Sequence, residues 1–485
     1  MPDLAPNLSP SLTVGLCLAM LAIVLLLDAL TRPRAPRRSG LRSATGSLVM
    51  CLAALAALGG ALVVTGSLVT SVVLVGAFAG LLALVSNVKN RVLGEPLVFT
   101  DFALVGAVFK HPQFYVSALR GWQIALILAG FAASAVLLAW WSSAAMVPRL
   151  QGLALAAVAG TALRFLLHAR RWDTLAQRPD SHRDVAAHGL VATLLVHWRR
   201  WRRQPDPAPC DEPTIAGRDD QLVIIVQCES FGDPAEIWND PALVLPGLAA
   251  ARALASRSGR LMTHGFGAYT MRTEYGVLFG RGEEALGLRR FDPFLTADGE
   301  TSYSLPRRLD PSRWTSHFVH PHDLRFYGRD RLMVEAGFSA LVGQDRFAPP
   351  GPDEGRYVTD AAVADVIAAL AQEAAGPTLI YAVTIENHGP WPAGKGGEES
   401  GAQYLRLLRH SDAMLARLTE LARGIGRPVI LCFFGDHRPS IPGVCEPGGD
   451  RHTPYVLLEF GPDGAPLGAT GRSEEDLTPA GLHHA

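Results

Sequence analysis

The distribution of apolar residues divides the chain at about residue 170. Before that point, five apolar runs are each about long enough to cross a bilayer as a helix. They lie at about 12–30, 47–66, 68–86, 122–141 and 150–167. Because soluble chains rarely contain several such runs in succession, we expect five membrane-spanning helices. The first run has no basic flank before it, which argues against a cleaved signal peptide.

From about residue 219 to 460, apolar runs of strand length alternate with amphipathic segments. Helices are expected between the strands, including Thr359–Gln372, which has an N-cap-like start, and Gln403–Arg423. This alternation is typical of an α/β domain with a mainly parallel central sheet. The expected strands are 222–228, 314–319, 378–385, 428–434 and 454–460.

Two shorter apolar segments, Phe99–Phe109 and Val185–Trp198, indicate interfacial or re-entrant structure rather than spans. Trp198–Pro209 is first basic and aromatic and then Pro-rich, which is typical of an interfacial anchor that ends in a linker. The final residues are Gly-rich and polar, which indicates poor order. The predicted organisation is a transmembrane helical domain at 1–170, an interfacial helix and linker at 171–218, the α/β domain at 219–462 and a flexible tail at 463–485.

Length and charge restrict the classes of function. A chain of 485 residues is too long for one ordinary domain. The net charge of -1 gives no reason to expect nucleic-acid binding, and the Arg-rich stretches lie beside apolar segments, where lipid headgroups are the expected partner. The six cysteines show no disulfide framework, because two lie in apolar helices and two in expected buried strands.

The charge pattern conflicts with the expected topology. Arg32, Arg34, Arg37 and Arg38 follow the first span and indicate that this loop is cytoplasmic. With five spans, the C-terminal half would then be cytoplasmic as well, whereas the chemistry below favours an outside location. Either of the two short apolar segments could change the number of crossings.

Candidate ligands follow two of the expected strands. Glu229 comes directly after the first strand of the α/β domain, where a carboxylate is either a metal ligand or the N-cap of the next helix. Asp436 and His437 follow another strand through Gly435, which permits a tight turn and places an oxygen and a nitrogen ligand side by side. That pair suits Mn²⁺ or Zn²⁺ better than Mg²⁺, which prefers oxygen ligands alone.

A candidate nucleophile lies in the Gly-rich segment 264–275, which runs into a helix-forming stretch. A threonine at a helix N-terminus is usually an N-cap. It can act as a nucleophile when a metal lowers its pKa and the helix N–H groups face an incoming phosphate. Thr270 and Thr273 both meet the sequence pattern, with Glu274 following directly.

Two further segments offer groups for a phosphorylated substrate. His388 lies on a Gly-Pro turn after an expected strand, where it either caps a carbonyl or serves as a proton donor or phosphate contact. Arg329 is suited to bidentate phosphate binding, and Tyr327 beside it supplies an aromatic wall.

Together these residues resemble the lipoteichoic acid synthase family, phosphoglycerol transferases of the sulfatase and alkaline phosphatase superfamily. The resemblance covers nearly the full length. Cys228-Glu229-Ser-Phe is similar to the family's Glu-Ser-Phe metal motif, Thr270-Met-Arg-Thr-Glu274 to its nucleophile motif, and Gly435-Asp436-His437 to its metal pair. Asn387-His388-x-Pro390 resembles its substrate-binding segment, and Tyr327-Gly-Arg329 its headgroup-binding Trp-x-Arg, with Tyr in place of Trp.

The resemblance implies a metal-dependent enzyme in the bacterial inner membrane with its catalytic domain outside. Thr270, rather than Thr273, would be both nucleophile and metal ligand, completing the set with Glu229, Asp436 and His437. The metal would be one divalent ion, Mn²⁺ in most members, with Zn²⁺ or Mg²⁺ as alternatives. Phosphatidylglycerol would donate glycerol phosphate through a phosphothreonine to an envelope glycan, with Arg329, Tyr327 and His388 binding the substrate and His388 moving the proton.

Other functions are compatible with the same pattern. Phosphoethanolamine transferases share the architecture and a threonine nucleophile, but they typically use zinc and disulfides. A sulfatase-fold phosphodiesterase, or an inactive membrane protein that binds lipid or glycan, is also conceivable. Sulfate-ester hydrolysis is disfavoured, because sulfatases need a Cys or Ser in a Cys-x-Pro-x-Arg motif, and Tyr269–Thr273 contains neither of these residues nor a proline.

Overall fold

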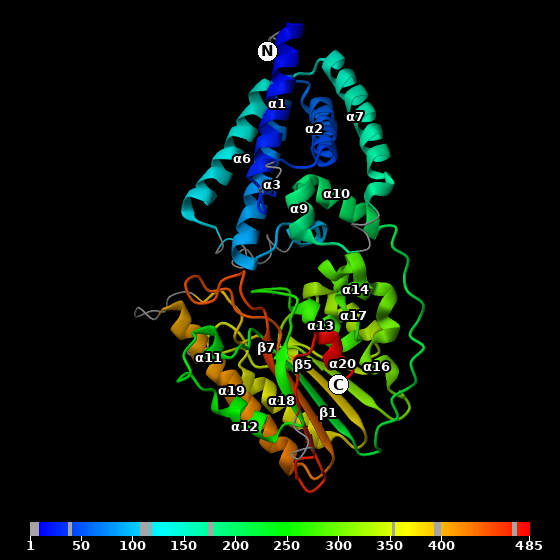
Figure 1. The fold of residues 1–485 in the computed structure, drawn as a ribbon, viewed down its shortest axis with the longest axis vertical. Helices are drawn as coiled ribbons and strands as arrows, with labels where there is room; N and C mark the ends of the chain where they lie inside the picture. The colour runs from blue at the N-terminus through cyan, green and yellow to red at the C-terminus, as the bar shows by residue number, and fades with distance from the viewer. Residues whose placement is uncertain are drawn as a thin grey trace. The chain divides into compact units, whose positions relative to one another are not determined.

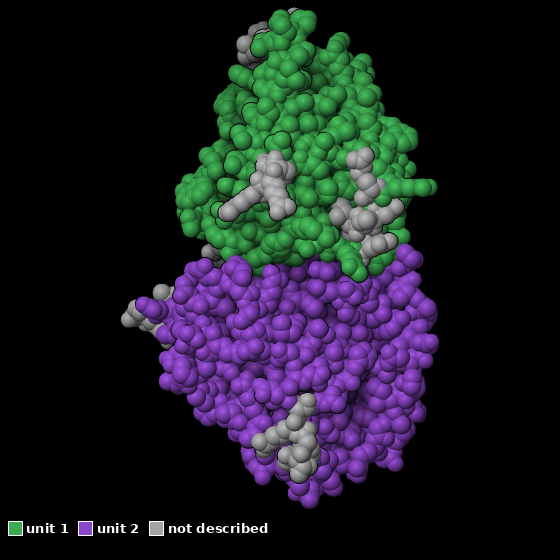
Figure 2. Space-filling view, viewed as in Figure 1, with its two compact units in different colours: residues 1–204 green, residues 205–485 purple. Residues whose placement is uncertain are grey.

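The computed structural model divides the chain into two compact units, Met1–Gln204 and Pro205–Ala485, which Figure 2 colours separately. The boundary between the two units falls within the segment 171–218, which the sequence predicts to be an interfacial helix and linker. The described residues are 9–36, 41–106, 116, 119–172, 178–351, 355–391, 399–467 and 473–485.

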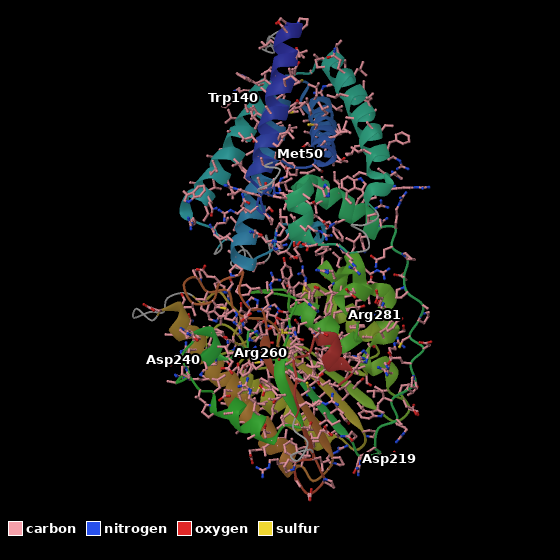
Figure 3. All side chains as sticks on the ribbon, viewed as in Figure 1. Met50, Trp140, Asp219, Asp240, Arg260 and Arg281 are labelled. Atoms are coloured by element: carbon pink, nitrogen blue, oxygen red, sulfur yellow. The ribbon has the colours of Figure 1, made fainter. Side chains whose placement is uncertain are left out.

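The first unit is helical, and five of its described helices are long and apolar enough to cross a membrane. This confirms the five expected spans. Met50, on the second of these helices, is buried among its neighbours, whereas Trp140 on the fourth is exposed (Figure 3). The five helices are α1 (Pro10–Leu30), α2 (Ala44–Thr65), α3 (Leu68–Leu93), α6 (Gly121–Trp141) and α7 (Met146–Leu167).

Helices α2 and α7 approach each other closely through glycine. A Cβ atom on Gly59 would lie 2.5 Å from the backbone nitrogen of Ala156, and one on Gly152 would lie 2.7 Å from the carbonyl oxygen of Gly59. Small residues are the usual means by which membrane helices bring their backbones together. Gly59 on α2 and Gly152 on α7 therefore permit the close approach of these two helices.

The short apolar segment 185–198 forms parts of two helices, α9 (Ser181–His188) and α10 (Leu190–Trp201), rather than one. Gly189 separates them with a φ of +87°, and a Cβ atom there would meet the Asp28 carboxylate at 2.3 Å. The Leu190 N–H donates to Asp28 at 2.8 Å, so the break is fixed to α1. The other short segment forms the 3₁₀ helix Phe99–Leu104, and its residues 107–109 lie outside the described residues.

The second unit contains an eight-stranded sheet in the order β4-β3-β5-β1-β6-β7-β2-β8, among the described residues. Strands β4 to β6 in this order are parallel, β7 is antiparallel to β6 and to β2, and β8 is parallel to β2. The expected mainly parallel sheet is confirmed. The strands are β1 (Leu222–Cys228), β2 (Arg257–Leu261), β3 (Thr315–Val319), β4 (Ala340–Val342), β5 (Thr378–Val383), β6 (Val429–Gly435), β7 (Thr453–Phe460) and β8 (Ser473–Glu474).

Helices cover both faces of this sheet (Figure 1). On one face the aliphatic side chains of β1, β5 and β6 pack against three helices in one large core. Those helices are α12 (Pro246–Leu254), α18 (Asp360–Glu373) and α19 (Ser400–Gly424). The other face carries the shorter helices, and Phe318 of β3 stacks there on Tyr381 of β5 with 6.1 Å between ring centroids. These are α13 (Thr270–Phe279), α14 (Glu283–Leu286), α16 (Leu305–Arg308), α17 (Arg329–Glu335) and α20 (Pro479–His483).

The end of the chain differs from the flexible tail expected at 463–485. Ser473 and Glu474 pair with β2 as strand β8. Helix α20 packs on α13, because a Cβ atom on Gly276 would lie 2.5 Å from Pro479 and the His483 ring hydrogen-bonds the Val277 carbonyl at 2.8 Å. These tertiary contacts extend the domain well beyond residue 462. The polar composition of this segment gives no indication of them.

Candidate metal centre

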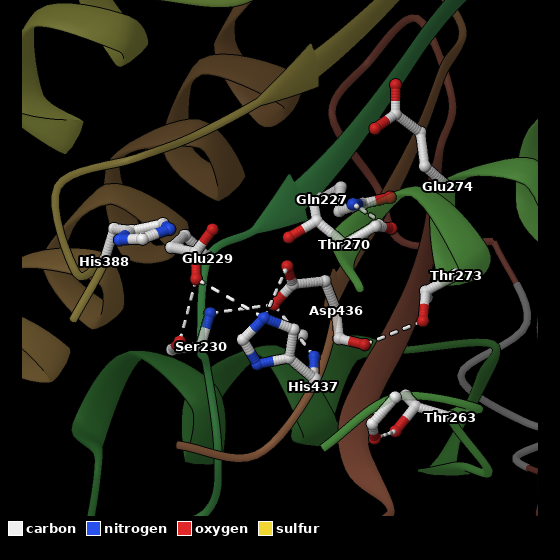
Figure 4. Close-up of polar contacts among 12 residues, drawn as sticks. Gln227, Glu229, Ser230, Thr263, Thr270, Thr273, Glu274, His388, Asp436 and His437 are labelled. Carbon is white, nitrogen blue, oxygen red and sulfur yellow. Dashed lines mark hydrogen bonds and ion pairs between the residues drawn. The ribbon is translucent and has the colours of Figure 1, made fainter. Parts of the chain in front are cut away.

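Strand register brings the predicted ligands together. Cys228 of β1 is the direct partner of Gly435 of β6, and the two strands are parallel. Glu229 and Asp436 are the next residues on the two strands, so both emerge at the same carboxyl edge of the sheet, where α/β enzymes bind ligands. Ligand atoms of Glu229, Asp436 and His437 lie within 4.8 Å of one another, and all three residues are buried (Figure 4).

The His437 ring is oriented for coordination. Its Nδ1 atom hydrogen-bonds the Arg438 carbonyl at 3.1 Å, which fixes the proton on that nitrogen. Its Nε2 atom lies 3.6 Å from Glu229 Oε1 and 3.5 Å from Asp436 Oδ2. The unprotonated nitrogen of a neutral ring therefore faces both carboxylates.

Ser230 holds both carboxylates in place. Its hydroxyl donates to Glu229 Oε1 at 2.8 Å, and its backbone N–H donates to Asp436 Oδ1 at 2.8 Å. The His437 N–H donates to the same Asp436 oxygen at 2.8 Å. One oxygen of each carboxylate is thus fixed by a hydrogen bond, which is how residues next to a metal site commonly orient its ligands.

The remaining atoms fit a divalent cation. Asp436 Oδ2 is buried and accepts no hydrogen bond from the described residues. Burial and the nearby Asp436 carboxylate raise the pKa of Glu229 to about 8, and His437 opposes both effects. Two buried carboxylates this close need a compensating positive charge. Two carboxylates and one imidazole form a donor set suited to Mn²⁺ or Zn²⁺.

Thr270 is the first residue of α13 and is buried. Its backbone carbonyl accepts a hydrogen bond from Gln227 Nε2 at 3.3 Å, and Gln227 lies on β1 two residues before Glu229 (Figure 4). Tyr381 donates to the Gln227 side-chain oxygen at 3.1 Å and so fixes the orientation of the amide. Sequence reasoning missed Gln227, although a lone amide near the end of an aliphatic strand was a visible signal.

The second threonine has a different environment. Thr273 is fully buried, and its hydroxyl donates to the backbone carbonyl of Asp436 at 2.7 Å. This contact joins α13 directly to the end of β6. Because its proton is already used to hold the backbone beneath the metal cluster, Thr273 is a structural residue, and Thr270 is the hydroxyl residue at the helix N-terminus.

Arg329 lies deeper than a surface phosphate-binding arginine would. It is 2% exposed, and its Nε and Nη2 atoms bind the Glu274 carboxylate, with a shortest distance of 2.6 Å. Among the described residues, Nη1 has no hydrogen-bond partner. The Arg329 charge lowers the Glu229 pKa, which places it within electrostatic reach of the cluster, and the guanidinium lies 5.3 Å from the centroid of the Tyr327 ring.

His388 is also near the cluster. Its Nδ1 atom donates to the Gly389 carbonyl at 2.6 Å, so a neutral ring carries no proton on Nε2. Burial lowers the pKa of His388, and the Asp436 carboxylate acts in the opposite direction. The ring is thus neutral at physiological pH and can accept a proton.

Backbone strain is concentrated at these residues. Four non-glycine residues in the described parts of the chain have positive φ, and three of them are predicted site residues or lie next to one. Such conformations cost about 1–3 kcal/mol each and persist mainly at functional sites. The three are Ser230 (φ 52°) after Glu229, Tyr269 (φ 75°) before Thr270, and Tyr327 (φ 60°), which is itself a predicted site residue two positions before Arg329.

His320 was not predicted from the sequence. It follows β3 directly, is buried, and hydrogen-bonds the Val383 carbonyl at 2.9 Å. Burial lowers the pKa of His320 well below its usual range, and Arg329 lowers it further. The same strand-end reasoning that identified Glu229 would have found it.

Comparison with known proteins agrees with this architecture. The sulfatase family model matches residues 221–483. The chain is 30% identical over 404 residues to the capsular polysaccharide biosynthesis protein RkpI of Rhizobium meliloti (strain 1021), and the match covers 77% of this chain and 74% of that protein.

Two solved structures are also similar. The phosphoglycerol transferase GacH of Streptococcus pyogenes, in complex with sn-glycerol-1-phosphate, is 20% identical with a TM-score of 0.44, covering 54% of this chain and 72% of that one. The integral membrane lipooligosaccharide phosphoethanolamine transferase A (EptA) of Neisseria meningitidis is 11% identical with a TM-score of 0.49, covering 95% and 94%. The match of the sulfatase model to more than half of the chain shows that this protein belongs to the sulfatase family.

Proposed function

We propose that this sulfatase-family member is a membrane-bound, metal-dependent phosphoglycerol transferase. It moves glycerol phosphate from phosphatidylglycerol to an envelope glycan through a phosphothreonine at Thr270. The observation that carries the proposal is the buried cluster of Glu229, Asp436 and His437, to which the start of α13 is joined by the Thr273 hydrogen bond. An activated hydroxyl beside a cation site is what phosphoryl transfer requires.

Glu229, Asp436 and His437, with the Thr270 hydroxyl as a fourth ligand, would hold one divalent cation. Bound there, the cation would lower the pKa of the Thr270 hydroxyl and neutralise charge on the transferred phosphate. We propose Mn²⁺, with Zn²⁺ as the main alternative, because an imidazole in the donor set is less suited to Mg²⁺.

The Thr270 oxygen attacks the phosphorus of phosphatidylglycerol. A bond forms between this oxygen and phosphorus, the bond from phosphorus to the diacylglycerol oxygen breaks, and the threonine proton passes to diacylglycerol. A hydroxyl of the acceptor then attacks phosphorus, the bond from phosphorus to the Thr270 oxygen breaks, and the acceptor proton passes through His388 Nε2 to restore the threonine hydroxyl. Arg329 binds a phosphate oxygen through Nη1, held rigidly by Glu274.

Two observations support an envelope glycan as the acceptor and an outside location for the enzyme. The relative RkpI is named for capsular polysaccharide biosynthesis. The first unit provides five helices able to cross a membrane, which would keep the second unit near lipid donors. A reporter fused after residue 210 is expected to be active only outside the cytoplasm, and activity inside would contradict this location.

Release of diacylglycerol tests the proposed reaction. Purified full-length protein with Mn²⁺ should release diacylglycerol from vesicles that contain phosphatidylglycerol, and chelation should stop the release. Thr270→Ala should lower the rate by at least a thousandfold, because it removes the attacking oxygen. If Thr270→Ala releases diacylglycerol as fast as the unaltered protein, the mechanism is wrong. Faster release from phosphatidylethanolamine would instead indicate a phosphoethanolamine transferase.

A further inference from the structure

Tyr357 lies beside the candidate site, three residues before α18, and none of the roles described above uses it. Its ring meets the His388 ring edge-on, with 5.7 Å between centroids and an interplanar angle of 66°. Its hydroxyl is buried and has no hydrogen-bond partner among the described residues. Leaving such a group unsatisfied costs about 1–3 kcal/mol, so the position favours a ligand that accepts a hydrogen bond.

The electrostatic surroundings make Tyr357 a hydrogen-bond donor. Burial, opposed by Arg356 and reinforced by the Glu229 carboxylate, raises the pKa of Tyr357 to about 12. The hydroxyl therefore keeps its proton at physiological pH. The influence of Glu229 also places this hydroxyl within electrostatic reach of the metal cluster.

Arg356 adds a positive charge to the same side of the site. Its guanidinium lies 5.3 Å from the centroid of the Tyr357 ring, and its charge lowers the pKa of His388. Arg356 itself is exposed. Among the described residues, the acidic group that shifts the pKa of Tyr357 is Glu229, which belongs to the buried cluster of candidate metal ligands.

We propose that Tyr357 and Arg356, here called the headgroup wall, select a hydroxylated headgroup over one that ends in an ammonium group. This inference rests on the proposed function and specifies which lipid the enzyme accepts as the donor of the phosphorylated headgroup. The phenol proton would be donated to a glycerol oxygen next to His388. An ethanolamine headgroup would bring an ammonium group, which cannot accept that hydrogen bond, toward the Arg356 charge. The ethanolamine headgroup would leave the Tyr357 hydroxyl without a hydrogen-bond acceptor and would place two positive charges close together. Both effects are effective sources of specificity.

Two variants test the headgroup wall through kcat/KM for diacylglycerol release from phosphatidylglycerol and from phosphatidylethanolamine. Tyr357→Phe should lower kcat/KM for phosphatidylglycerol about tenfold, mainly through KM, because one hydrogen bond is lost. Arg356→Gln should raise the ratio of phosphatidylethanolamine to phosphatidylglycerol activity at least threefold. Neither change should alter metal affinity.

Tyr303→Phe is the matched control. Arg281 lies 4.3 Å from the centroid of the Tyr303 ring, and the Tyr303 hydroxyl donates to the Ala208 carbonyl, so the control removes a similar hydroxyl beside a similar arginine. It should leave the headgroup ratio unchanged. The inference is overturned if the two headgroup-wall variants keep the wild-type ratio and the wild-type KM for phosphatidylglycerol.

Binding provides a measurement that does not depend on turnover. Metal-loaded wild-type protein should be stabilised against heat more by glycerol phosphate than by phosphoethanolamine, and Arg356→Gln should reduce that preference. If the wild type releases no diacylglycerol but keeps this preference, the proposed function fails while the headgroup wall stands. If glycerol phosphate and phosphoethanolamine stabilise the protein equally, the proposed role of the headgroup wall is wrong, whether or not the protein releases diacylglycerol.

Discussion

At the scale of single residues, the candidate site depends on a few hydrogen bonds that orient its ligands. Ser230 donates once to each of two carboxylates, through its hydroxyl to Glu229 and through its N–H to Asp436. Only the first bond depends on the side chain. The Ser230 side chain is therefore a positioning group for Glu229.

Replacing Ser230 by Ala should weaken metal binding about tenfold, because such supporting partners typically contribute 10–100-fold to metal affinity. Titration of metal-free protein with Mn²⁺ measures the change. Ser312→Ala is the control, since its hydroxyl donates at 2.7 Å to the Asp310 carboxylate on the surface. Equal metal affinity of the two variants would show that Ser230 does not position Glu229.

Asp360 provides a test of pH dependence away from the metal ligands. Burial and the Glu386 carboxylate beside it raise the pKa of Asp360 to about 7. The pKa of Asp360 is higher in the folded state than in the unfolded chain. Its contribution to stability is therefore complete below about pH 4, decreases as the pH rises, and is lost above about pH 7.

Asp360→Asn should therefore stabilise the protein relative to wild type at pH 8 more than at pH 5. A difference on the order of 2 kcal/mol is expected, below the upper bound set by about 1.4 kcal/mol per pKa unit. Chemical unfolding of both proteins at the two pH values measures it. A stability difference that is the same at both values would contradict the raised pKa.

The sequence predicts the identity of the ligands better than their surroundings. Glu229, Asp436 and His437 each follow an apolar strand with a recognisable residue pattern, and the structure brings them together. The ion pair of Arg329 with Glu274 joins residues 55 positions apart, which no local pattern reveals. The environment of Tyr357 likewise depends on contacts with residues distant in the sequence.

At the scale of elements, the site depends on how closely the ends of β1 and β6 approach. A Cβ atom on Gly435 would lie 1.9 Å from the Phe231 carbonyl oxygen, which belongs to backbone just after β1. Only glycine permits this approach. The close contact keeps Glu229 and Asp436 at adjacent positions on the sheet edge.

Gly435→Ala should separate the two strand ends, destabilise the protein by roughly 1–3 kcal/mol and abolish tight Mn²⁺ binding. Thermal unfolding and metal titration measure the two effects. Gly424→Ala is the control, because a Cβ atom at the end of α19 would meet no other atom within 4 Å. If Gly435→Ala binds Mn²⁺ as tightly as the wild type, the close approach at Gly435 is not what holds Glu229 and Asp436 together.

Five of the eight described strands could be predicted because each is an apolar run: β1, β3, β5, β6 and β7. The other three lack this signal. Strand β2 reads Arg-Ser-Gly-Arg-Leu, β4 has three residues and β8 has two, so their pairing is decided by neighbours in the sheet. Strand order and register, which place Glu229 beside Asp436, cannot be read from apolar runs at all.

At the scale of the whole molecule, metal binding and folding should be linked. The cluster of Glu229 and Asp436 is buried, and burial together with the Asp436 carboxylate raises the Glu229 pKa to about 8, so the metal-free state has an electrostatic cost. A ligand that binds only the folded state stabilises it. Removal of the metal should lower the Tm by several degrees, and Mn²⁺ should restore it, as measured by thermal unfolding in detergent.

Glu229→Gln is the control for this linkage, because it removes the charge that the cation compensates. Its Tm should respond much less to chelation and to added Mn²⁺. A wild-type Tm that is unaffected by chelator and by metal would contradict the assignment of a cation site. The membrane unit should not contribute, since its described helices contain no comparable cluster of ligands.

The central claim, that Thr270 carries the transferred group, is tested most directly by mass spectrometry of the protein itself. Full-length protein with Mn²⁺ is mixed with phosphatidylglycerol, quenched in acid, and digested. The account predicts a glycerol phosphate adduct on the peptide that contains Thr270, its absence after chelation, and its absence in Thr270→Ala. Rapid diacylglycerol release without any adduct on Thr270, and at an equal rate in Thr270→Ala, would contradict it.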